Sequence, residues 1–434
     1  MIESVVSPTE SPVAVASDQP ATARRRTPIA ALLAGNAVSL VGNQLTALAI
    51  PWFVLQTTGS AGKTGLVAAF TLLPTVVAMV FGGALSDRFG HRRMSVFSDL
   101  LSAGTVAAVP LLYHTVGLPF AALLALAFCG ALFDAPGITA RGALIPEAAA
   151  LARLPLERVN GASQAIQSLA VLVGPLLAGG LIATMGASNV LWLDAASFLV
   201  SAAAIGALVP EVRVEPAVRG RYLDEVKDGW RFLVNDPLLR TIGGIATVIN
   251  FLTAPLFAVL LPVLADREYG SANALGVTVA AIGGGALVGA LLYGAIGAAL
   301  PSRPVLIGSF AIAWAPLVLV AGAPPLWLTA LAAGLCGLGL GPINPIVLTA
   351  MYGRVPVALR GRVLGALSAT AMFASPAGVL LAGGLVELVG VQTVIVAIAI
   401  GLTLLTIPLL ISPALHYLDS ATTIDVAGTV RADK

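Results

Sequence analysis

The sequence has very little charge for its length. Only 10% of its 434 residues are Asp, Glu, Lys or Arg, whereas 58% are hydrophobic, and the mean hydropathy is +0.96. A water-soluble protein of this length covers its surface with polar side chains, and this chain has too few of them. The composition therefore excludes a soluble globular protein.

Cysteine, histidine and nucleotide-binding motifs are also scarce or missing. The chain has two Cys and three His residues, too few for a disulfide framework or a cysteine-rich metal cluster. It contains no Walker loop, dinucleotide fingerprint, zinc-protease motif or nucleophile elbow. We therefore expect no metal, no cofactor, no enzymatic activity and no nucleic-acid partner.

Long apolar runs take the place of these features. Each run is long enough to cross about 30 Å of hydrocarbon as a helix, and a β-barrel would show short alternating segments instead. The pattern predicts an all-α polytopic membrane protein with twelve spans, near 28–56, 64–86, 94–114, 117–140, 158–184, 189–209, 238–265, 273–300, 303–322, 325–350, 362–388 and 391–411.

The longest interruption, 210–237, divides the spans into two sets of six. Its segment "RYLDEVKDGWRFLVNDPLLR" has apolar residues at helical spacing, which predicts an amphipathic helix on the membrane surface. This helix is either a spacer or a regulatory element. The predicted regions are a disordered cytoplasmic tail at 1–27, a six-helix bundle at 28–209, a cytoplasmic linker at 210–237, a second six-helix bundle at 238–411, and a cytoplasmic tail at 412–434.

The basic residues predict the orientation. With the N-terminus in the cytoplasm, 21 of the 23 Lys and Arg residues fall in inner segments, and only Lys63 and Arg267 fall outside. Arg141 is counted here in the loop that follows the fourth span. Cytoplasmic loops of membrane proteins carry this excess of positive charge, so both termini are expected in the cytoplasm.

The two sets of spans are related by a repeat. Residues 158–186 and 362–390 align without a gap at an offset of 204, with 14 of 29 positions identical, including the shared "LLAGGL". Both segments run from the inside to the outside, so the repeat is parallel and its pseudo-two-fold axis lies along the membrane normal. Two six-helix bundles around such an axis are typical of the major facilitator fold, with substrate bound between them.

A short charged turn, "GGALSDRFGHRR" at 82–93, carries the family motif. It resembles the motif G-x-L-x-D-R-x-G-R-R between the second and third spans of the major facilitator superfamily; the matching positions are Gly83, Leu85, Asp87, Arg88, Gly90, Arg92 and Arg93. Within the superfamily the chain is similar to the drug-exporter branch, near the Tap-type multidrug pumps and the macrolide efflux proteins. That similarity lies in "IPWFVLQTTGSAGKTGLVAAF", "ARGALIPEAA", "GLGLGPINPI" and "LRGRVLGALS".

The resemblance implies a role for this turn. In the family, the acid of the motif latches the two halves at the inner side when the protein opens outward, which here means Asp87 against the start of the eleventh span at Arg362. Asp134, near the inner end of the fourth span, either joins this inner gate or serves as a proton site. Asp99 is expected to pair with Arg92 or Arg93.

A second motif lies in the fifth span. "VGPLLAGGL" resembles the G-P-x-x-G-G motif of antiporters, with Gly174, Pro175, Gly179 and Gly180 matching and Ala178 replacing one glycine. Small residues and a proline allow helices to approach and slide. The same residues would serve plain packing, so the motif favours export without proving it.

The remaining polar residues inside spans are candidates for binding. A carboxylate facing lipid would cost about 2.5–3.5 kcal/mol, so Asp194 and Asp134 are the candidate proton sites. Asn43 stands where related pumps often have a carboxylate, and it either contacts substrate or has a structural role. The uncharged candidates for a substrate cavity are Asn43, Gln164, Gln167, Asn250 and Asn344.

Together these features predict a secondary transporter in the inner membrane of a bacterium. The favoured function is proton-coupled efflux of amphiphilic drugs or natural products by alternating access. The alternative is a dedicated exporter of one endogenous metabolite, such as a siderophore or an antibiotic. Uptake and a non-transporting scaffold are less favoured. The expected partners are a lipophilic small molecule, protons and the lipid bilayer, with the monomer as the functional unit.

Overall fold

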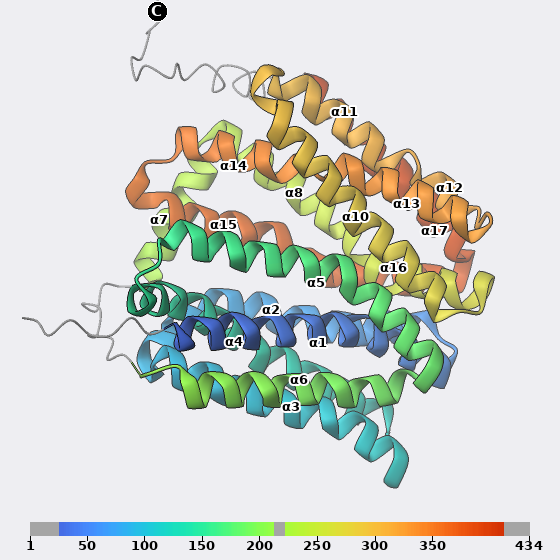
Figure 1. Ribbon diagram of the computed structural model, residues 1–434. Helices are drawn as coiled ribbons and strands as arrows, with labels where there is room; N and C mark the ends of the chain where they lie inside the picture. The colour runs from blue at the N-terminus through green and yellow to red at the C-terminus, as the bar shows by residue number, and fades with distance from the viewer. Residues whose placement is uncertain (1–25, 212–221, 412–434) are drawn as a thin grey trace, which may run out of the picture.

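The computed structural model describes residues 26–211 and 222–411, and these residues form helices joined by short turns (Figure 1). Residues 1–25 and 412–434, which make up nearly all of the two predicted tails, and residues 212–221 of the predicted linker lie outside the described residues. No strand occurs in the described ranges. The predicted all-α fold is confirmed.

The first half contains six long helices. They are α1 (Thr27–Thr58), α2 (Ala61–Phe89), α3 (His91–Thr115), α4 (Phe120–Ala152), α5 (Leu156–Met185) and α6 (Ala187–Leu208). The turns are short because they use glycine or a capping side chain. Gly59 ends α1 in the left-handed conformation, and the Ser60 hydroxyl accepts a hydrogen bond from the Lys63 N–H at the start of α2.

The linker and the second half contain more, shorter helices. In chain order they are α7 (Tyr222–Asn235), α8 (Pro237–Pro255), η1 (Leu256–Leu260), α9 (Leu261–Leu264), η2 (Ala265–Tyr269), α10 (Ala272–Ile296), η3 (Gly297–Ala299), α11 (Ser302–Trp314), α12 (Leu317–Ala321), α13 (Leu326–Leu340), α14 (Ile343–Arg354), η4 (Val357–Leu359), α15 (Arg360–Phe373), α16 (Ser375–Val389), α17 (Val391–Leu404) and α18 (Thr406–Ile411). Several of these are consecutive parts of one membrane span.

Prolines cause most of these breaks. A proline ring clashes with the carbonyl of the residue four positions earlier and removes one hydrogen bond. Accordingly α17 ends at Leu404, four residues before Pro408, and the predicted span at 391–411 is split into α17 and α18. In the described residues, eleven helical segments are long and apolar enough to cross a membrane, and α17 is a shorter apolar helix.

The sequence repeat is visible in the helix bounds. The segment formed by α5 covers Leu156–Met185, and the segment formed by α15 and α16 covers Arg360–Val389. Both are 30 residues long, and both bounds differ by the offset of 204. Gly186 and Gly390 follow them with φ of 84° and 83°, a conformation that side chains of L-residues rarely adopt. The same turn chemistry thus ends both copies.

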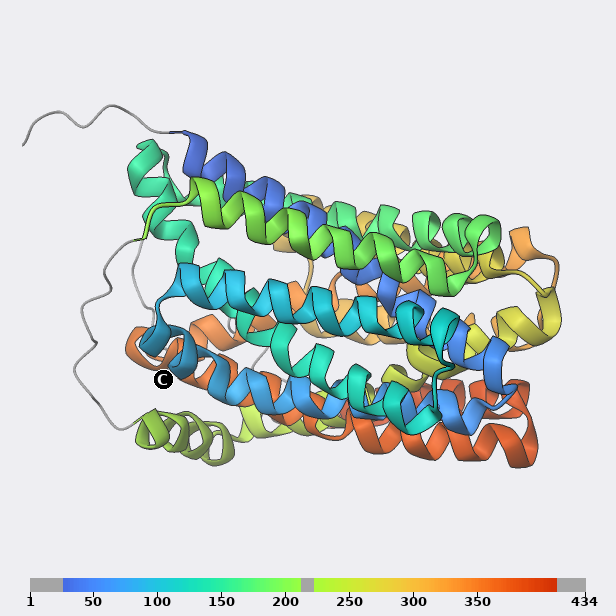
Figure 2. The same ribbon diagram turned by 90° about the horizontal axis from the view of Figure 1, so that it is seen from below.

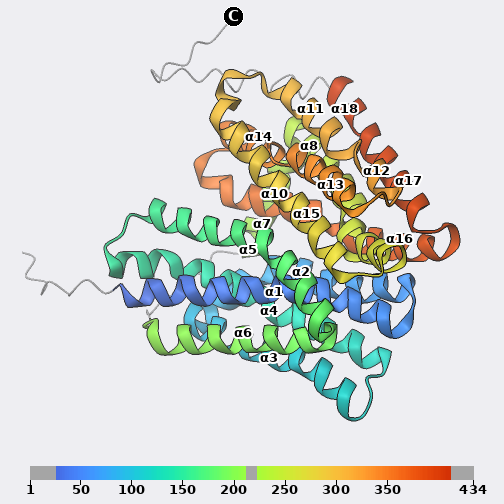
Figure 3. The same ribbon diagram turned by 45° about the vertical axis from the view of Figure 1, so that its right-hand side comes forward.

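The helices form two groups that correspond to the two halves of the sequence. In Figures 1 and 3 the blue-to-green helices of the first half lie together, next to the yellow-to-red helices of the second half. Within the first half α1 packs on α5 and α6, and α3 packs on α4 and α6. Contacts between the halves are mainly α5 with α10 and α2 with α16.

The two ends of the molecule differ in charge. We call the end at which α1, α3 and α5 begin the basic end, because Arg88, Arg153 and Arg360 lie there; Lys63 and Arg267 lie at the other end, which we call the opposite end. Helix α7 and the start of α1 are both at the basic end (Figure 2). The hydrophobic core runs through both halves.

Candidate functional site

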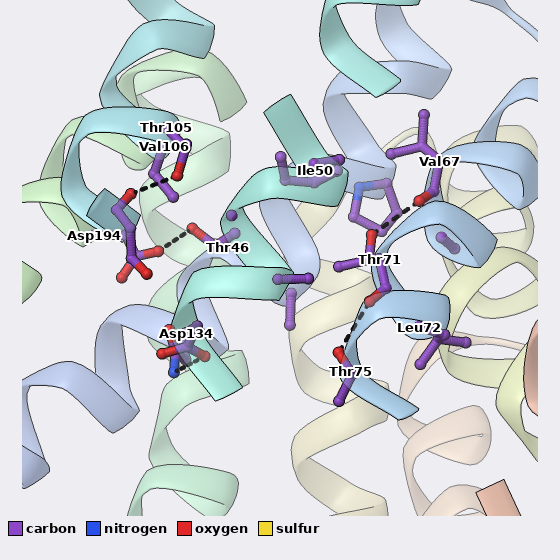
Figure 4. A pocket seen from close by; sticks show the side chains of 18 of the residues that line it. Thr46, Ile50, Val67, Thr71, Leu72, Thr75, Thr105, Val106, Asp134 and Asp194 are labelled. Atoms are coloured by element: carbon purple, nitrogen blue, oxygen red, sulfur yellow. Dashed lines mark hydrogen bonds between the residues drawn. The ribbon is translucent and has the colours of Figure 1, made fainter. Parts of the chain in front are cut away.

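A cavity of about 500 Å³ lies mainly in the first half (Figure 4). Its walls come from α1, α2, α3, α4 and α6, and the second half contributes Ala254, Phe257 and Ala258. Most lining side chains are aliphatic. An apolar cavity with a few placed polar groups is typical of small-molecule sites.

Threonine side chains supply much of the polar lining. Thr71 donates its hydroxyl hydrogen to the Val67 carbonyl at 2.8 Å, and Thr75 donates to the Thr71 carbonyl at 2.9 Å (Figure 4). Thr105 donates to the Leu101 carbonyl at 3.0 Å. Because these hydrogens are used within their own helices, the hydroxyls offer the cavity only acceptor oxygens and methyl groups.

Asp194 of α6 is the most buried acid of the cavity. Its side chain is 1% exposed, and it accepts hydrogen bonds from the Thr46 hydroxyl at 2.5 Å and the Ser197 hydroxyl at 3.1 Å. A methyl group at Gly42 of α1 would overlap both Asp194 and Ser197. The carboxylate therefore occupies space that α1 leaves free only because residue 42 is glycine.

Asp134 of α4 is the second acid of the cavity. The Asn43 side-chain amide donates to its Oδ2 at 3.2 Å, and Arg141 Nη2 lies 3.9 Å from its Oδ1. Its side chain is partly exposed, unlike that of Asp194. Asn43 therefore lines the cavity and also holds an acid that is a candidate proton site.

Arg141 is placed differently from its prediction. Helix α4 continues to Ala152, so Arg141 lies inside the helix and not in a loop, and it is 2% exposed. Its Nη1 pairs with Asp99 Oδ1 at 2.5 Å. The expected pairing of Asp99 with Arg92 or Arg93 is wrong, because the first of those arginines donates to the Gly206 carbonyl and the second pairs with Glu211 at 2.6 Å.

The electrostatic balance of the cavity favours positive charge. Among the lining residues that the structure describes, the charged side chains are Asp134 and Asp194, and both are acidic. The nearby Arg141 is already paired with Asp99. A buried carboxylate requires a proton, a cation or hydrogen bonds to offset its desolvation. The cavity can therefore bind protons or the positively charged part of an amphiphilic molecule.

Most of the predicted uncharged cavity residues lie elsewhere in this structure. Of the five, only Asn43 lines the described cavity. Gln164 and Gln167 are on exposed positions of α5, and Asn344 is exposed at the start of α14. Asn250 is half-buried and donates to the Ala246 carbonyl at 2.9 Å within α8.

The antiporter-like motif of α5 lies at helix contacts. A Cβ at Gly174 would meet the Gln44 side chain of α1 at 2.5 Å, and one at Gly179 would meet the Ala272 carbonyl of α10 at 2.8 Å. Pro175 is buried between these glycines, whereas Gly180 has only Asn273 nearby, at 4.0 Å. The motif thus joins α5 to both halves of the protein.

The charged turn of the family motif lies at the basic end. Gly90 joins α2 to α3 with φ 86° and ψ 133°, a conformation suited to glycine. Arg88 is exposed. The side chain of Asp87 and the surroundings of Gly83 lie outside the described residues. Arg362 Nη1 lies 3.5 Å from Asp228 Oδ2 of α7.

At the opposite end, a carboxylate joins the two halves. Glu387 of α16 accepts hydrogen bonds from the Ser60 hydroxyl at 3.0 Å and from the Gly62 N–H at 3.1 Å. These donors are at the N-terminus of α2, where the helix dipole favours an anion. A second contact across the halves is the hydrogen bond from Gln56 to Asp266 at 2.7 Å.

Sequence reasoning identified Asp134, Asp194 and Asn43 because polar residues inside apolar runs are conspicuous. It did not identify Gly42 or Thr46, because glycine and threonine are common in membrane helices and carry no signal by themselves. Their importance follows only from the packing of α1 against α6.

Two groups of membrane-spanning helices around a cavity with buried acids define a secondary transporter of the two-bundle type. The chain matches the family model of the Major Facilitator Superfamily over residues 32–257 and 243–423, and it belongs to that superfamily. The predicted family is confirmed.

Curated relatives lie in the drug-exporter branch, as predicted. The chain is 36% identical to the multidrug efflux pump Tap of Mycobacterium tuberculosis (strain H37Rv) over 407 residues, covering 92% of this chain and 97% of the relative. It is 30% identical to the enterobactin exporter EntS of Citrobacter koseri over 356 residues, covering 80% and 82%.

Solved structures share the fold at low sequence identity. The nucleoside transporter NupG has a TM-score of 0.71 and 14% identity, with 89% of this chain and 98% of that chain covered. A bacterial homologue of the human lysosomal transporter Spinster, in an inward-facing and unoccupied conformation, has a TM-score of 0.62 and 14% identity, with 91% and 95% covered.

Proposed function

We propose that the protein is a proton-coupled exporter of amphiphilic drugs or natural products in the inner membrane of a bacterium. The observation that carries the proposal is the apolar cavity with two acids, the buried Asp194 and the partly exposed Asp134, and no basic side chain among the lining residues that the structure describes. The 36% identity to a multidrug efflux pump over nearly the whole chain supports it.

The proposed mechanism is alternating access of this cavity. The basic end faces the cytoplasm, in accordance with the excess of arginine there. At the opposite end the halves are in contact through Gly179 with Gly276 and through Gly65 with Gly383. While these contacts hold the opposite end closed, substrate enters the cavity from the cytoplasmic side. Export requires the contacts to separate.

Protons enter the cycle at the two cavity acids. In the outward-facing state, Asp194 or Asp134 of the transporter takes up a proton. The neutral acid no longer attracts a cationic substrate, which is released. After the return to the cytoplasm-facing state, a cationic substrate displaces the proton to the cytoplasm. Asp87 and Arg88, together with Gly83, Gly90, Arg92, Arg93 and Arg362, are proposed to latch the basic end in the outward-facing state.

The test measures proton movement in inside-out vesicles that contain the protein and have been acidified inside. Ethidium, a lipophilic cation, and a panel of neutral lipophilic antibiotics are added, and the internal pH is followed. The expected result is that ethidium and several panel compounds discharge the gradient, and that Asp194→Asn and Asp134→Asn together abolish the discharge. A double variant that discharges the gradient like the wild type would exclude both acids.

The alternative is a dedicated exporter of one endogenous metabolite, such as a siderophore or an antibiotic. The observation that favours it is the 30% identity to the enterobactin exporter EntS over 80% of the chain. In the same vesicles a dedicated exporter discharges the gradient with one chemical class only. We further propose that the monomer is the functional unit, because the cavity is built from a single chain.

A further inference from the structure

The first half contains polar groups that the cavity does not account for. Five fully buried serines, on α1, α3 and α6, have hydroxyl groups without a hydrogen-bond partner. Beside them lies the buried Asp99–Arg141 pair, in which Asp99 Oδ2 and the Nε and Nη2 atoms of Arg141 also have no hydrogen-bond partner. Arg141 Nη2 lies 3.9 Å from Asp134 Oδ1. We call these residues the polar seam: Ser39, Ser95, Ser98, Ser102 and Ser201, with Asp99 and Arg141.

The serines of the seam lie on the faces of α1, α3 and α6 where these helices pack together. On α3, residues 95, 98, 99 and 102 have the spacing of one helix face, and on α6 the same is true of Asp194, Ser197 and Ser201. Helices α3 and α6 pack against each other, and α6 packs against α1. Ser201 of α6 lies beside Asp99 of α3, at the limit of hydrogen-bonding geometry.

Glycines on the neighbouring helices make room for these polar groups. A Cβ at Gly35 of α1 would lie 3.5 Å from the Ser201 hydroxyl. A Cβ at Gly137 of α4 would lie 2.8 Å from the Ser98 Cβ and 3.6 Å from Arg141 Nη1. Gly137 therefore leaves the space that Ser98 occupies, whereas Gly35 lies at ordinary contact distance from Ser201.

The seam leads from the basic end to Asp194. Ser95 is one turn from the start of α3, and one turn earlier the buried Arg92 Nε also has no partner. From Ser95 to Ser102, and from Ser201 to Asp194, the distance along each helix is about 10 Å. Ser102 and Asp194 both line the cavity as well, so the seam and the cavity meet at these two residues.

Buried polar groups are almost always hydrogen-bonded, and in clusters of this kind the missing partner is usually bound water. We propose that the polar seam holds a file of water molecules that carries protons between the basic end and Asp194, on a route separate from the path of the substrate. The proposal rests on the proton-coupled function proposed above.

The proton balance of this route is simple. Each water or hydroxyl accepts one proton on one side and releases another on the other side, so the file is unchanged after it reorients. The proton delivered converts the Asp194 carboxylate to the acid, and the reverse transfer returns it to the cytoplasm. Arg141 offsets the charge of Asp99 and lies 3.9 Å from Asp134, so the acids beside the file face a positive charge.

The first test follows proton exchange at Asp194 itself. The infrared carboxyl band of Asp194 is assigned by its loss in Asp194→Asn, and its shift is timed after transfer of the purified protein from H2O to D2O. With a neutral lipophilic antibiotic of the panel filling the cavity, so that Asp194 keeps its proton, Ser98→Ala/Ser201→Ala should slow the exchange at least about tenfold. The matched control is Ser309→Ala, which removes a buried serine of α11 in the second half.

The second test measures transport of ethidium in reconstituted vesicles. The double variant should bind ethidium and exchange labelled for unlabelled ethidium like the wild type, but should accumulate it much more slowly when a pH gradient is the only driving force. Ser98→Ala/Ser201→Thr, which restores one hydroxyl, should recover part of the rate. Wild-type ethidium binding by Ser98→Ala/Ser201→Ala would show that this variant folds.

The outcomes separate the two proposals. A wild type that binds ethidium but moves no protons overturns the proposed coupling. The seam proposal alone is overturned if the wild type and Ser98→Ala/Ser201→Ala couple ethidium transport to the pH gradient equally well and show the same infrared exchange rate. The seam also fails if Asp194 gives no carboxyl band at any pH, since it then receives no proton.

Discussion

Single residues of α1 determine where the acids of the cavity lie. Gly42 leaves the space that Asp194 and Ser197 occupy, and Thr46 donates to Asp194 from the next turn of the same helix. The first half therefore controls the geometry of its acids through a helix that carries no charge at these positions.

We predict that Gly42→Ala destabilises the protein, although alanine is normally better than glycine in a helix by about 1 kcal/mol. The new methyl group displaces Asp194, so the melting temperature in detergent and the proton-coupled transport of ethidium in vesicles should both fall. The matched control is Gly104→Ala on α3, where a Cβ meets nothing within 4 Å; it should be neutral or stabilising. Equal melting curves for Gly42→Ala and Gly104→Ala would contradict the packing argument.

We predict that Arg141→Met is strongly destabilising, by about 3–5 kcal/mol, because it leaves the Asp99 carboxylate buried without its partner. Asp99→Asn/Arg141→Met should lose much less, because both charges are then removed. Thermal unfolding of the two single variants and the double variant gives the coupling energy. Additive losses would show that the two residues do not interact.

At the residue scale the sequence predicted only part of the site. Asp134, Asp194 and Asn43 are visible as polar residues within apolar runs. The serines of the seam are not, because a serine can satisfy itself on its own helix and is tolerated anywhere in a span. Arg141 was assigned to a loop because the predicted fourth span ended at residue 140, whereas α4 continues to Ala152.

At the scale of elements, the helices were largely predictable because membrane spans are long and apolar. The sequence did not predict where proline interrupts the helices, as between α17 and α18. It also did not predict where a carboxylate near a helix end binds a second helix, as Asp236 and Glu387 do.

Asp236 caps α8 and binds a second element. It accepts from the Leu238 and Leu239 N–H groups at 2.9 and 3.1 Å and from Arg354 Nε at 2.8 Å. Burial raises the pKa of Asp236, but the hydrogen bonds from Arg354 and from the N–H groups outweigh it and hold the pKa below its ordinary value.

A lowered pKa in the folded state means that ionised Asp236 stabilises the protein above the ordinary aspartate value of about 4, and that this contribution is lost as the pH falls further. We predict that Asp236→Ala lowers the melting temperature at pH 7 and that the difference from wild type shrinks toward pH 3. A difference independent of pH would show that the carboxylate charge is not involved.

Glu387 is predicted to hold the opposite end closed. Glu387→Ala removes the acceptor of the Ser60 and Gly62 hydrogen bonds between α16 and α2, so spin-label distances across this end should shift toward the open state. The matched control is Glu268→Ala, which removes an acid at the same end whose partner, Gln392, belongs to the same half. The idea fails if the two variants give the same distance distribution.

At the scale of the whole molecule, the repeat places equivalent glycines at both contacts between the halves. Gly179 and Gly383 are 204 residues apart and face Gly276 and Gly65. The repeat was predictable from sequence, but the partners of these glycines were not. They lie in an A-x-x-x-G pattern shared by α2 (Ala61, Gly65) and α10 (Ala272, Gly276), and small residues at this spacing are common in membrane helices.

We predict that Gly276→Ala and Gly65→Ala act in the same direction. A Cβ would lie 2.5 Å from the Pro175 carbonyl in the first case and 2.9 Å from the Val379 carbonyl in the second, so each methyl group pushes the halves apart at the opposite end. Spin-label distances across that end should increase in both. Gly384→Ala, where a Cβ meets nothing within 4 Å, is the control and should leave them unchanged.

The uneven composition of the cavity wall has an evolutionary consequence. In the described part of the chain, both acids and nearly all lining residues belong to the first half, and the second half contributes Ala254, Phe257 and Ala258. After the ancestral duplication, selection for substrate recognition would act on the first half. The second half would need only to keep the surfaces through which it contacts the first half. A hybrid that joins the first half of this chain to the second half of a relative should therefore inherit its substrate range from the first parent.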